Sequence, residues 1–286
     1  MTTLREREAT SARRASPPSQ PRHARRRSRS GGARRRSWGS RIIGGIGEVF
    51  ITLGVVGLLF LVWELWWTGL DADRDRQEAT DEFFSSIESA DEQGEGSGEG
   101  GDGSDAGPEP DRITDLAETG DAMAMVYAPR LGGEWAAPVR SGVESESLDR
   151  AGLGHYPTTQ LPGEPGNFAL AGHRQTYGSI LWNQDQFVPG DQIYVHSPDG
   201  FYTYEVRETH IVQPSQSDVL SPLPNEPGED PGDASWLTLT TCHPPYTTLE
   251  RMVTHAEMVD FQPLSDGPPE EISEQVGQHL SASGGA

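Results

Sequence analysis

The sequence has no lysine and only one cysteine, Cys242. A single cysteine excludes an internal disulfide, so Cys242 is either a small buried core residue or a thiol with a chemical role. Hydrophobic residues make up 34% of the 286 residues, a low share for a chain that is globular throughout, and there are 34 glycines and 22 prolines. This composition predicts one folded domain joined to long solvated segments.

Positive charge is concentrated at one end of the chain. Thirteen arginines and only two acidic residues lie within residues 1–41, which gives this segment a net charge near +11. The whole chain carries −22, so the remaining residues carry a charge near −33. This asymmetry predicts a basic, disordered cytoplasmic tail and an acidic body on the other side of a membrane. Nucleic-acid binding is the alternative, but no aromatic ladder accompanies the arginines, so we expect membrane lipid and no nucleic acid as the partner.

Residues 42–70 have the length and composition of a single transmembrane anchor. The apolar run reaches the roughly 20 residues that cross a bilayer if Glu48 and Glu64 lie near the two interfaces. Tryptophans gather at its far end, as in an aromatic belt: Trp63, Trp66 and Trp67. A cleaved signal peptide is the alternative, but the run is long and no small-residue cleavage pattern follows it. Since arginines stay in the cytoplasm, the C-terminal region is predicted to be extracellular.

Three further regions differ in composition. Residues 71–120 are acidic and glycine-rich and predict a flexible, disordered linker, with a short helix allowed over residues 71–89. Residues 121–262 contain many short β-type segments separated by turns, which predict an all-β barrel or sandwich. Expected strands are 122–127, 167–172, 192–196, 201–206, 210–212, 236–241 and 252–261, and expected short helices are 144–152 and 179–186. Residues 263–286 return to serine, glycine, proline and acids and are expected to be a disordered tail.

Cys242 closes one of the expected strands and is followed by a proline-rich loop. If residues 243–249 form that loop, the next strand is a neighbour and brings Arg251 close to the thiol. An arginine there would favour the thiolate, or would hold an oxyanion. An amide leaving group also needs an acid, and His173 at the end of another expected strand is the best placed histidine. By strand alternation, the adjacent His243 should point the other way.

These segments together resemble the sortases. The shared elements are Asn-Phe-Ala-Leu-Ala-Gly-His-Arg at residues 167–174, Thr-Leu-Thr-Thr-Cys-His-Pro at residues 238–244, and Arg251 after a short loop. The resemblance covers residues 121–262 and is greatest to class E sortases of actinobacteria. It implies an eight-stranded sortase β-barrel with one or two short helices. His243 departs from the pattern, because many relatives carry a smaller residue after the cysteine.

The resemblance also implies a reaction. Cys242 would attack the Thr–Gly bond of a C-terminal sorting motif and form a thioester, His173 would act as acid and base, and Arg251 would stabilise the oxyanion. The partners would be surface proteins with a Leu-Ala-x-Thr-Gly or Leu-Pro-x-Thr-Gly motif and a peptidoglycan amine, with no metal or organic cofactor. Thr241, Tyr156 and Tyr177 are candidate substrate-binding residues, although both tyrosines are also plausible as packed aromatics.

Three other functions fit less well. A pilus-polymerising sortase often carries a lid and a C-terminal membrane helix, whereas the C-terminal residues here are polar. An L,D-transpeptidase would show a Ser-His-Gly-Cys element in place of Thr-Thr-Cys-His. A non-catalytic cell-surface binding module would need the histidine, cysteine and arginine to match by accident. Cys242 reactivity toward a thiol probe distinguishes this last alternative.

Overall fold

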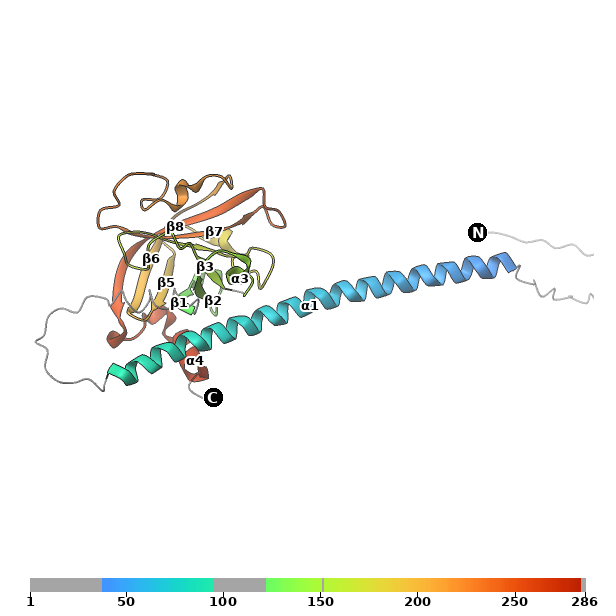
Figure 1. Ribbon diagram of the computed structural model, residues 1–286, viewed down its shortest axis with the longest axis horizontal. Coiled ribbons are helices and arrows are strands. Elements are labelled where there is room, and N and C mark those ends of the chain that lie inside the picture. The colour runs from blue at the N-terminus through green and yellow to red at the C-terminus, as the bar shows by residue number, and fades with distance from the viewer. Residues whose placement is uncertain (1–37, 95–121, 151, 284–286) are drawn as a thin grey trace, which may run out of the picture. The chain divides into compact units, whose positions relative to one another are not determined.

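The described residues of this computed structural model are 38–94, 122–150 and 152–283. They contain a closed eight-stranded β-barrel with the strand order β1-β2-β3-β4-β7-β8-β6-β5, and Figure 1 labels these strands except β4. The strands are β1 (Ala122–Tyr127), β2 (Ala136–Ser141), β3 (Leu153–His155), β4 (Gly166–Ala171), β5 (Gln192–Ser197), β6 (Gly200–Val212), β7 (Ser235–His243) and β8 (Glu250–Pro263). The helices are α1 (Trp38–Gly94), α3 (Ser145–Leu148) and α4 (Glu270–Ser283). The expected all-β barrel is therefore confirmed.

The barrel closes because two parallel pairings join its antiparallel parts. β2 runs parallel to β3 and β4 runs parallel to β7, whereas β1–β2, β1–β5, β3–β4, β5–β6, β6–β8 and β7–β8 are antiparallel. Closure leaves no free sheet edge to pair with other chains. The β5–β6 hairpin turns between Ser197 and Gly200, as its Ser-Pro-Asp-Gly sequence predicts.

Alternation along the strands separates an inner and an outer face. On β7, Leu237 and Leu239 belong to the buried core, together with Phe168 and Leu170 of the parallel β4. The intervening residues of both strands therefore face outward. Cys242 lies four residues after the outward-facing Thr238 on the same strand, so its side chain also faces outward. Only outward-facing side chains of the neighbouring strands can therefore contact it.

Within the barrel domain, two strands were missed from the sequence, and one expected helix is absent. β2 and β3 lack alternating β-branched patterns, so neither was expected. The helix expected at residues 144–152 exists as the short α3, but residues 179–186 contain only a 3₁₀ turn at Gln184–Gln186. Hydrogen bonds from Trp182 to Ser179 and from Leu181 to His173 hold this segment as an irregular loop instead.

Residues 71–94 continue α1, so the predicted disordered linker is wrong there, although the short helix allowed over residues 71–89 covers most of this stretch. Four apolar residues there recur on one helical face and are buried against β1 and β5: Ala79, Phe83, Phe84 and Ile87. Arg140 of β2 also donates to Glu82 at 2.6 Å. In the sequence, the many acidic residues of this segment made the helical spacing of its apolar residues hard to recognise. The rest of the expected linker, residues 95–120, lies outside the described residues.

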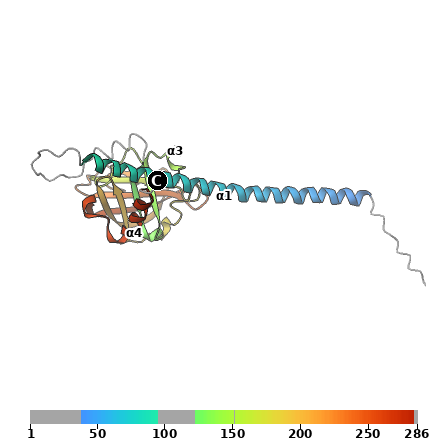
Figure 2. The ribbon, with the colours of Figure 1, turned by 90° about the horizontal axis from the view of Figure 1, so that it is seen from below.

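The expected disordered tail is likewise wrong for residues 270–283, which form α4 against the barrel (Figure 2). Ile272 and Val276 lie one turn apart and are 1% and 2% exposed, so they anchor the helix to the same cluster as Phe83 and Phe84. Glu270 and Glu271 in the first turn suit the positive end of the helix dipole.

The chain divides between Val56 and Gly57 into two units, of which the second contains the barrel. The N-terminal part of α1 contains a stretch, Gly45–Trp63, that is long and apolar enough to cross a membrane. Its apolar side chains are exposed, as expected for a helix that contacts lipid rather than protein. The expected tail over residues 1–37 lies outside the described residues.

Candidate active site

The pairing of β7 with β8 places Cys242 directly opposite Arg251. Directly opposite residues of antiparallel strands share a face and have Cβ atoms about 4.5–5.5 Å apart. The pairing thus places the two residues side by side on one face, as the short loop predicts. The loop at residues 244–249 returns the chain between them, and Thr247 closes it by donating to the carbonyl of Pro244.

His173 lies on the other side of Cys242, because β4 runs parallel to β7. Ala171 pairs with Thr240, and the next residue, Gly172, donates its N–H to the carbonyl of Thr240 at 3.1 Å. Continuing this register by two residues past Ala171 brings His173 level with Cys242, with its side chain on the same outer face. The histidine, cysteine and arginine thus form one row across three adjacent strands at the rim of the barrel, which we call the catalytic row.

The imidazole of His173 is held by a carboxylate that the sequence reasoning missed. Its Nε2 lies 2.8 Å from Oδ1 of Asp149, the C-terminal cap of α3, and both side chains are part-exposed. Tyr177 covers the other side, with ring centroids 5.1 Å apart. In the neutral imidazole, an Nε2–H donated to Asp149 leaves Nδ1 as the atom able to accept a proton. In the sequence, Asp149 lay inside the helix expected over residues 144–152, and no local signal marked it as a partner of His173.

Arg251 is oriented by its own loop. One of its terminal nitrogens, Nη1, donates to the carbonyls of Thr248 and Glu250 at 3.1 and 3.0 Å. The donors on Nε and Nη2 remain available for a ligand, and a guanidinium can use them as a rigid fork. The part-buried Arg251 is thus positioned without an ion pair to any of the described residues.

The remaining predicted residues lie around this row with different roles. Thr241 is 2% exposed and donates its hydroxyl to the carbonyl of Gly172, so it fixes the backbone that carries His173. Tyr156 reaches the outer face, where its hydroxyl hydrogen-bonds with Thr240 at 3.0 Å. Tyr177 is 47% exposed and therefore accessible to a ligand.

His243 points away from the thiol, as alternation predicts. Its Nδ1 accepts a hydrogen bond of 2.7 Å from Nη1 of Arg174, which is itself only 4% exposed. The guanidinium of Arg174 also reaches Asp185 at 3.3 Å. The unusual histidine therefore belongs to an arginine-centred network on the inner face, which sequence reasoning did not anticipate.

A closed barrel with a cysteine, a histidine and an arginine aligned at its rim has the architecture of a cysteine enzyme that transfers acyl groups. Comparison with known proteins supports this class. Residues 126–259 match the family model described as "Sortase domain". The chain is 32% identical to sortase SrtE2 of Streptomyces coelicolor over 239 residues, covering 79% of this chain and 87% of the relative.

Two further comparisons agree. Sortase SrtE1 of Streptomyces coelicolor is 32% identical over 249 residues, which span 84% of this chain and 64% of that relative. A solved structure, the SrtA sortase from Actinomyces oris, is 33% identical with a TM-score of 0.51, covering 59% of this chain and 90% of that one. The chain therefore belongs to the sortase family of cysteine transpeptidases, and it has class E homologues.

Proposed function

We propose that this protein is a membrane-anchored sortase that cleaves a Leu-Ala-x-Thr-Gly or Leu-Pro-x-Thr-Gly motif between Thr and Gly. It then transfers the new carboxyl end of the surface protein to a peptidoglycan amine. The observation that carries this proposal is the strand register, which pairs Cys242 with Arg251 and runs β7 parallel to β4, the strand that His173 follows by two residues.

In the first step, the thiolate of Cys242 attacks the carbonyl carbon of the motif threonine. The carbonyl oxygen becomes an oxyanion, and the Nε and Nη2 donors of Arg251 stabilise it. Loss of one such donor typically costs 10²–10³ in kcat. Because Nη1 is held by the loop carbonyls, the guanidinium does not need to reorganise as the charge develops.

In the second step, the C–N bond breaks, and the glycine amine takes a proton from His173. The product is a thioester on Cys242, and water or an amine then attacks it while His173 removes a proton from that nucleophile. The proton moves at Nδ1, since Nε2 is directed to Asp149. Asp149 acts as a positioning residue that fixes the tautomer and orientation of the imidazole.

Three residues near the row would shape the substrate groove. Tyr177 offers an exposed ring beside the imidazole, and Tyr156 offers a hydroxyl on the outer face. Thr241 contributes indirectly, because its buried hydroxyl supports Gly172 and so the position of His173.

The proposed location follows from the anchor. Gly45–Trp63 would cross the membrane, and the thirteen arginines before it would keep the N-terminus in the cytoplasm. The barrel would then face the cell wall. The single cysteine provides a test: an impermeant thiol reagent added to intact cells should label Cys242, and protection until lysis would contradict this orientation.

The reaction is tested with the full chain in detergent and quenched peptides that carry either motif. Intact-mass measurement should detect a thioester adduct in the wild type and none in Cys242→Ala, with cleavage between Thr and Gly. A peptide with Thr and Gly exchanged is the matched control. If a folded wild type forms no adduct with either motif, the non-catalytic binding module becomes the better account.

A further inference from the structure

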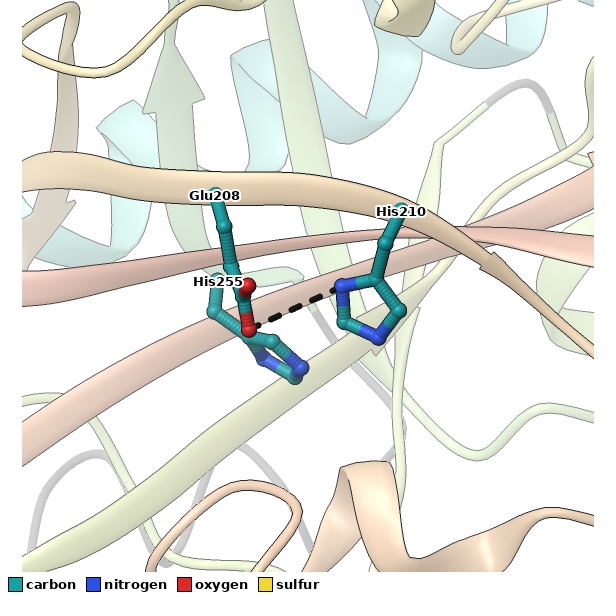
Figure 3. Close-up of side chains that lie close together, drawn as sticks. All are labelled: Glu208, His210 and His255. Atoms are coloured by element: carbon teal, nitrogen blue, oxygen red, sulfur yellow. Dashed lines mark ion pairs between the residues drawn. The ribbon is translucent and has the colours of Figure 1, made fainter.

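A second cluster of polar side chains lies on the outer face of the barrel, away from the catalytic row. Glu208 and His210 project from β6 and His255 projects from β8, and Figure 3 shows the three side chains converging. Their oxygen and nitrogen atoms all lie within 4.8 Å of one another, and Nδ1 of His210 is 3.7 Å from Oε1 of Glu208. The two imidazole rings have centroids 5.2 Å apart.

A β-bulge creates this convergence. Val206 pairs with Ala256 but Glu208 pairs with His255, so Arg207 is an extra residue in β6. If β6 and β8 paired regularly at this point, Arg207 would lie opposite His255, and the side chains of Glu208 and His210 would point into the barrel rather than outward. The bulged Arg207 is engaged elsewhere, since it pairs with Glu205 and Glu257 and leaves the carboxylate of Glu208 to the cluster.

Hydrogen bonds fix the tautomer of His255. The amide nitrogen of Asn167 donates to the carbonyls of Val219 and Ser221, so its Oδ1 must be an acceptor and receives the hydroxyl proton of Thr238 at 2.7 Å. The Thr238 oxygen is then an acceptor for Nδ1–H of His255, at 2.8 Å. In the neutral imidazole of His255, the lone pair is therefore on Nε2.

That lone pair has no protein partner. His255 is 1% exposed, and its Nε2 is buried without a hydrogen bond among the described residues; Nδ1 of His210 is buried likewise without one. Two unpaired imidazole nitrogens beside a carboxylate are the environment that a metal ion would satisfy.

We propose that Glu208, His210 and His255 bind a Zn²⁺ ion. Two imidazoles and one carboxylate are a common zinc ligand set, and an outer hydrogen bond such as that from Thr238 typically orients the ligating histidine. Tetrahedral Zn²⁺ requires ligand atoms about 3.3 Å apart, so the ligands must approach by up to about 1.5 Å. The carboxylate of Glu208 can move, because that side chain is 55% exposed.

The ion would connect β6 to β8 beside the loop that joins β6 to β7. A surface hollow of about 360 Å³, lined by Glu208, Asn225 and His255 among others, gives access from solvent. Asn225 of that loop donates to Glu208 at 3.3 Å, so the ion would also stabilise the loop. Thr238 lies four residues before Cys242 along β7, about 13 Å away, so the ion takes no part in the thioester chemistry.

Binding is tested with the full chain in detergent, in a Cys242→Ala background so that the thiol cannot bind the metal. After removal of metals, titration of Zn²⁺ against a chromophoric chelator should show one tight site. Glu208→Gln and His210→Gln, both at part-exposed positions, should each weaken binding by more than the roughly 10- to 100-fold that loss of an outer partner costs. Thr238→Val should weaken it by about 10- to 100-fold without removing a ligand.

His279→Gln is the matched control, since it removes another part-buried histidine that lies outside the cluster, and it should bind as the background protein does. Ca²⁺ and Mg²⁺ in excess should not displace Zn²⁺, because they prefer oxygen ligands. Replacement by Co²⁺ should give the visible spectrum of a tetrahedral ion. Absence of a tight site, or a site that persists unchanged in Glu208→Gln and His210→Gln, would overturn the proposal.

Discussion

Two faces of the same barrel carry opposite kinds of side chain. The face of β4, β7 and β8 holds the catalytic row, whose polar groups are part-exposed; Asp149 holds His173, and two loop carbonyls hold Arg251. The face of β1 and β5 is covered by α4 and by residues 79–87 of α1, with Phe83 and Phe84 fully buried. A reacting side chain must be accessible to substrate, whereas the helices are held to the barrel by side chains that are buried. Substitutions should therefore separate activity from stability cleanly.

The largest effect is expected on the catalytic face. Arg251→Ala should lower kcat of peptide cleavage by about 10²–10³, because it removes the oxyanion donors. The free energy of unfolding of the Arg251→Ala variant should differ from that of wild type by less than about 0.5 kcal/mol, because the side chain is only partly buried. Steady-state kinetics and chemical denaturation measure the two quantities. Arg251→Lys is the control that keeps the charge without the fork, and equal activity of both variants and wild type would exclude the proposed role.

The reverse result is expected on the helix-covered face. Phe84→Ala removes a fully buried ring and should destabilise the protein by about 3–5 kcal/mol. Cleavage per folded molecule should remain unchanged, because the ring does not contact the catalytic row. Denaturant unfolding of the full chain measures the loss, and Phe84→Leu should lose less. A Phe84→Ala protein as stable as wild type would show that α1 does not stabilise the barrel.

The covered face should also make the protein sensitive to acid. His196 is stacked on Phe201 with ring centroids 4.2 Å apart and contacts Phe83 and Phe84. Burial lowers its pKa to about 3, and His279 of α4 adds a smaller effect in the same direction. Since the unfolded chain binds the proton more readily, this stabilisation is complete above about pH 6.5 and is lost as pH falls toward 3.

The pH effect can be isolated with His196→Phe, which keeps an aromatic ring and removes the titration. Between pH 7 and pH 5, wild type should lose about 2 kcal/mol more than this variant, at 1.36 kcal/mol per pH unit below 6.5. Denaturation at the two pH values measures the difference. His255 titrates in both proteins and cancels in the comparison. If both proteins lost the same unfolding free energy between pH 7 and pH 5, protonation of His196 would not destabilise the folded state.

The smallest effect on activity is expected at Asp149, the residue that positions the imidazole of His173. Asp149→Asn should lower kcat by about tenfold with an unchanged KM, less than the 10²–10⁴ that the imidazole itself contributes. Glu144→Gln, at the exposed other end of α3, is the matched control and should have no effect. A change in KM alone would assign Asp149 to substrate binding instead.

Local patterns located most of the barrel strands and pointed to the candidate catalytic residues. β1, β4, β5 and β7 were located within a residue or two, because alternation and turn residues act over short distances. The proximity of Cys242 and Arg251 followed from one short loop. β2 and β3 were missed, since their pairing depends on distant strands rather than on their own residues.

The sequence by itself determined the barrel, the apolar helix and the row of histidine, cysteine and arginine, because each depends on contacts close in the chain or on a specific motif. Tertiary structure alone decided which acids and histidines meet. Asp149 reaches His173 from another element, and a one-residue bulge turns Glu208 toward His255. It also decided that acidic residues 71–94 and residues 270–283 are helical. Their few apolar side chains are stabilised only when the outer surface of β1 and β5 is present to bury them.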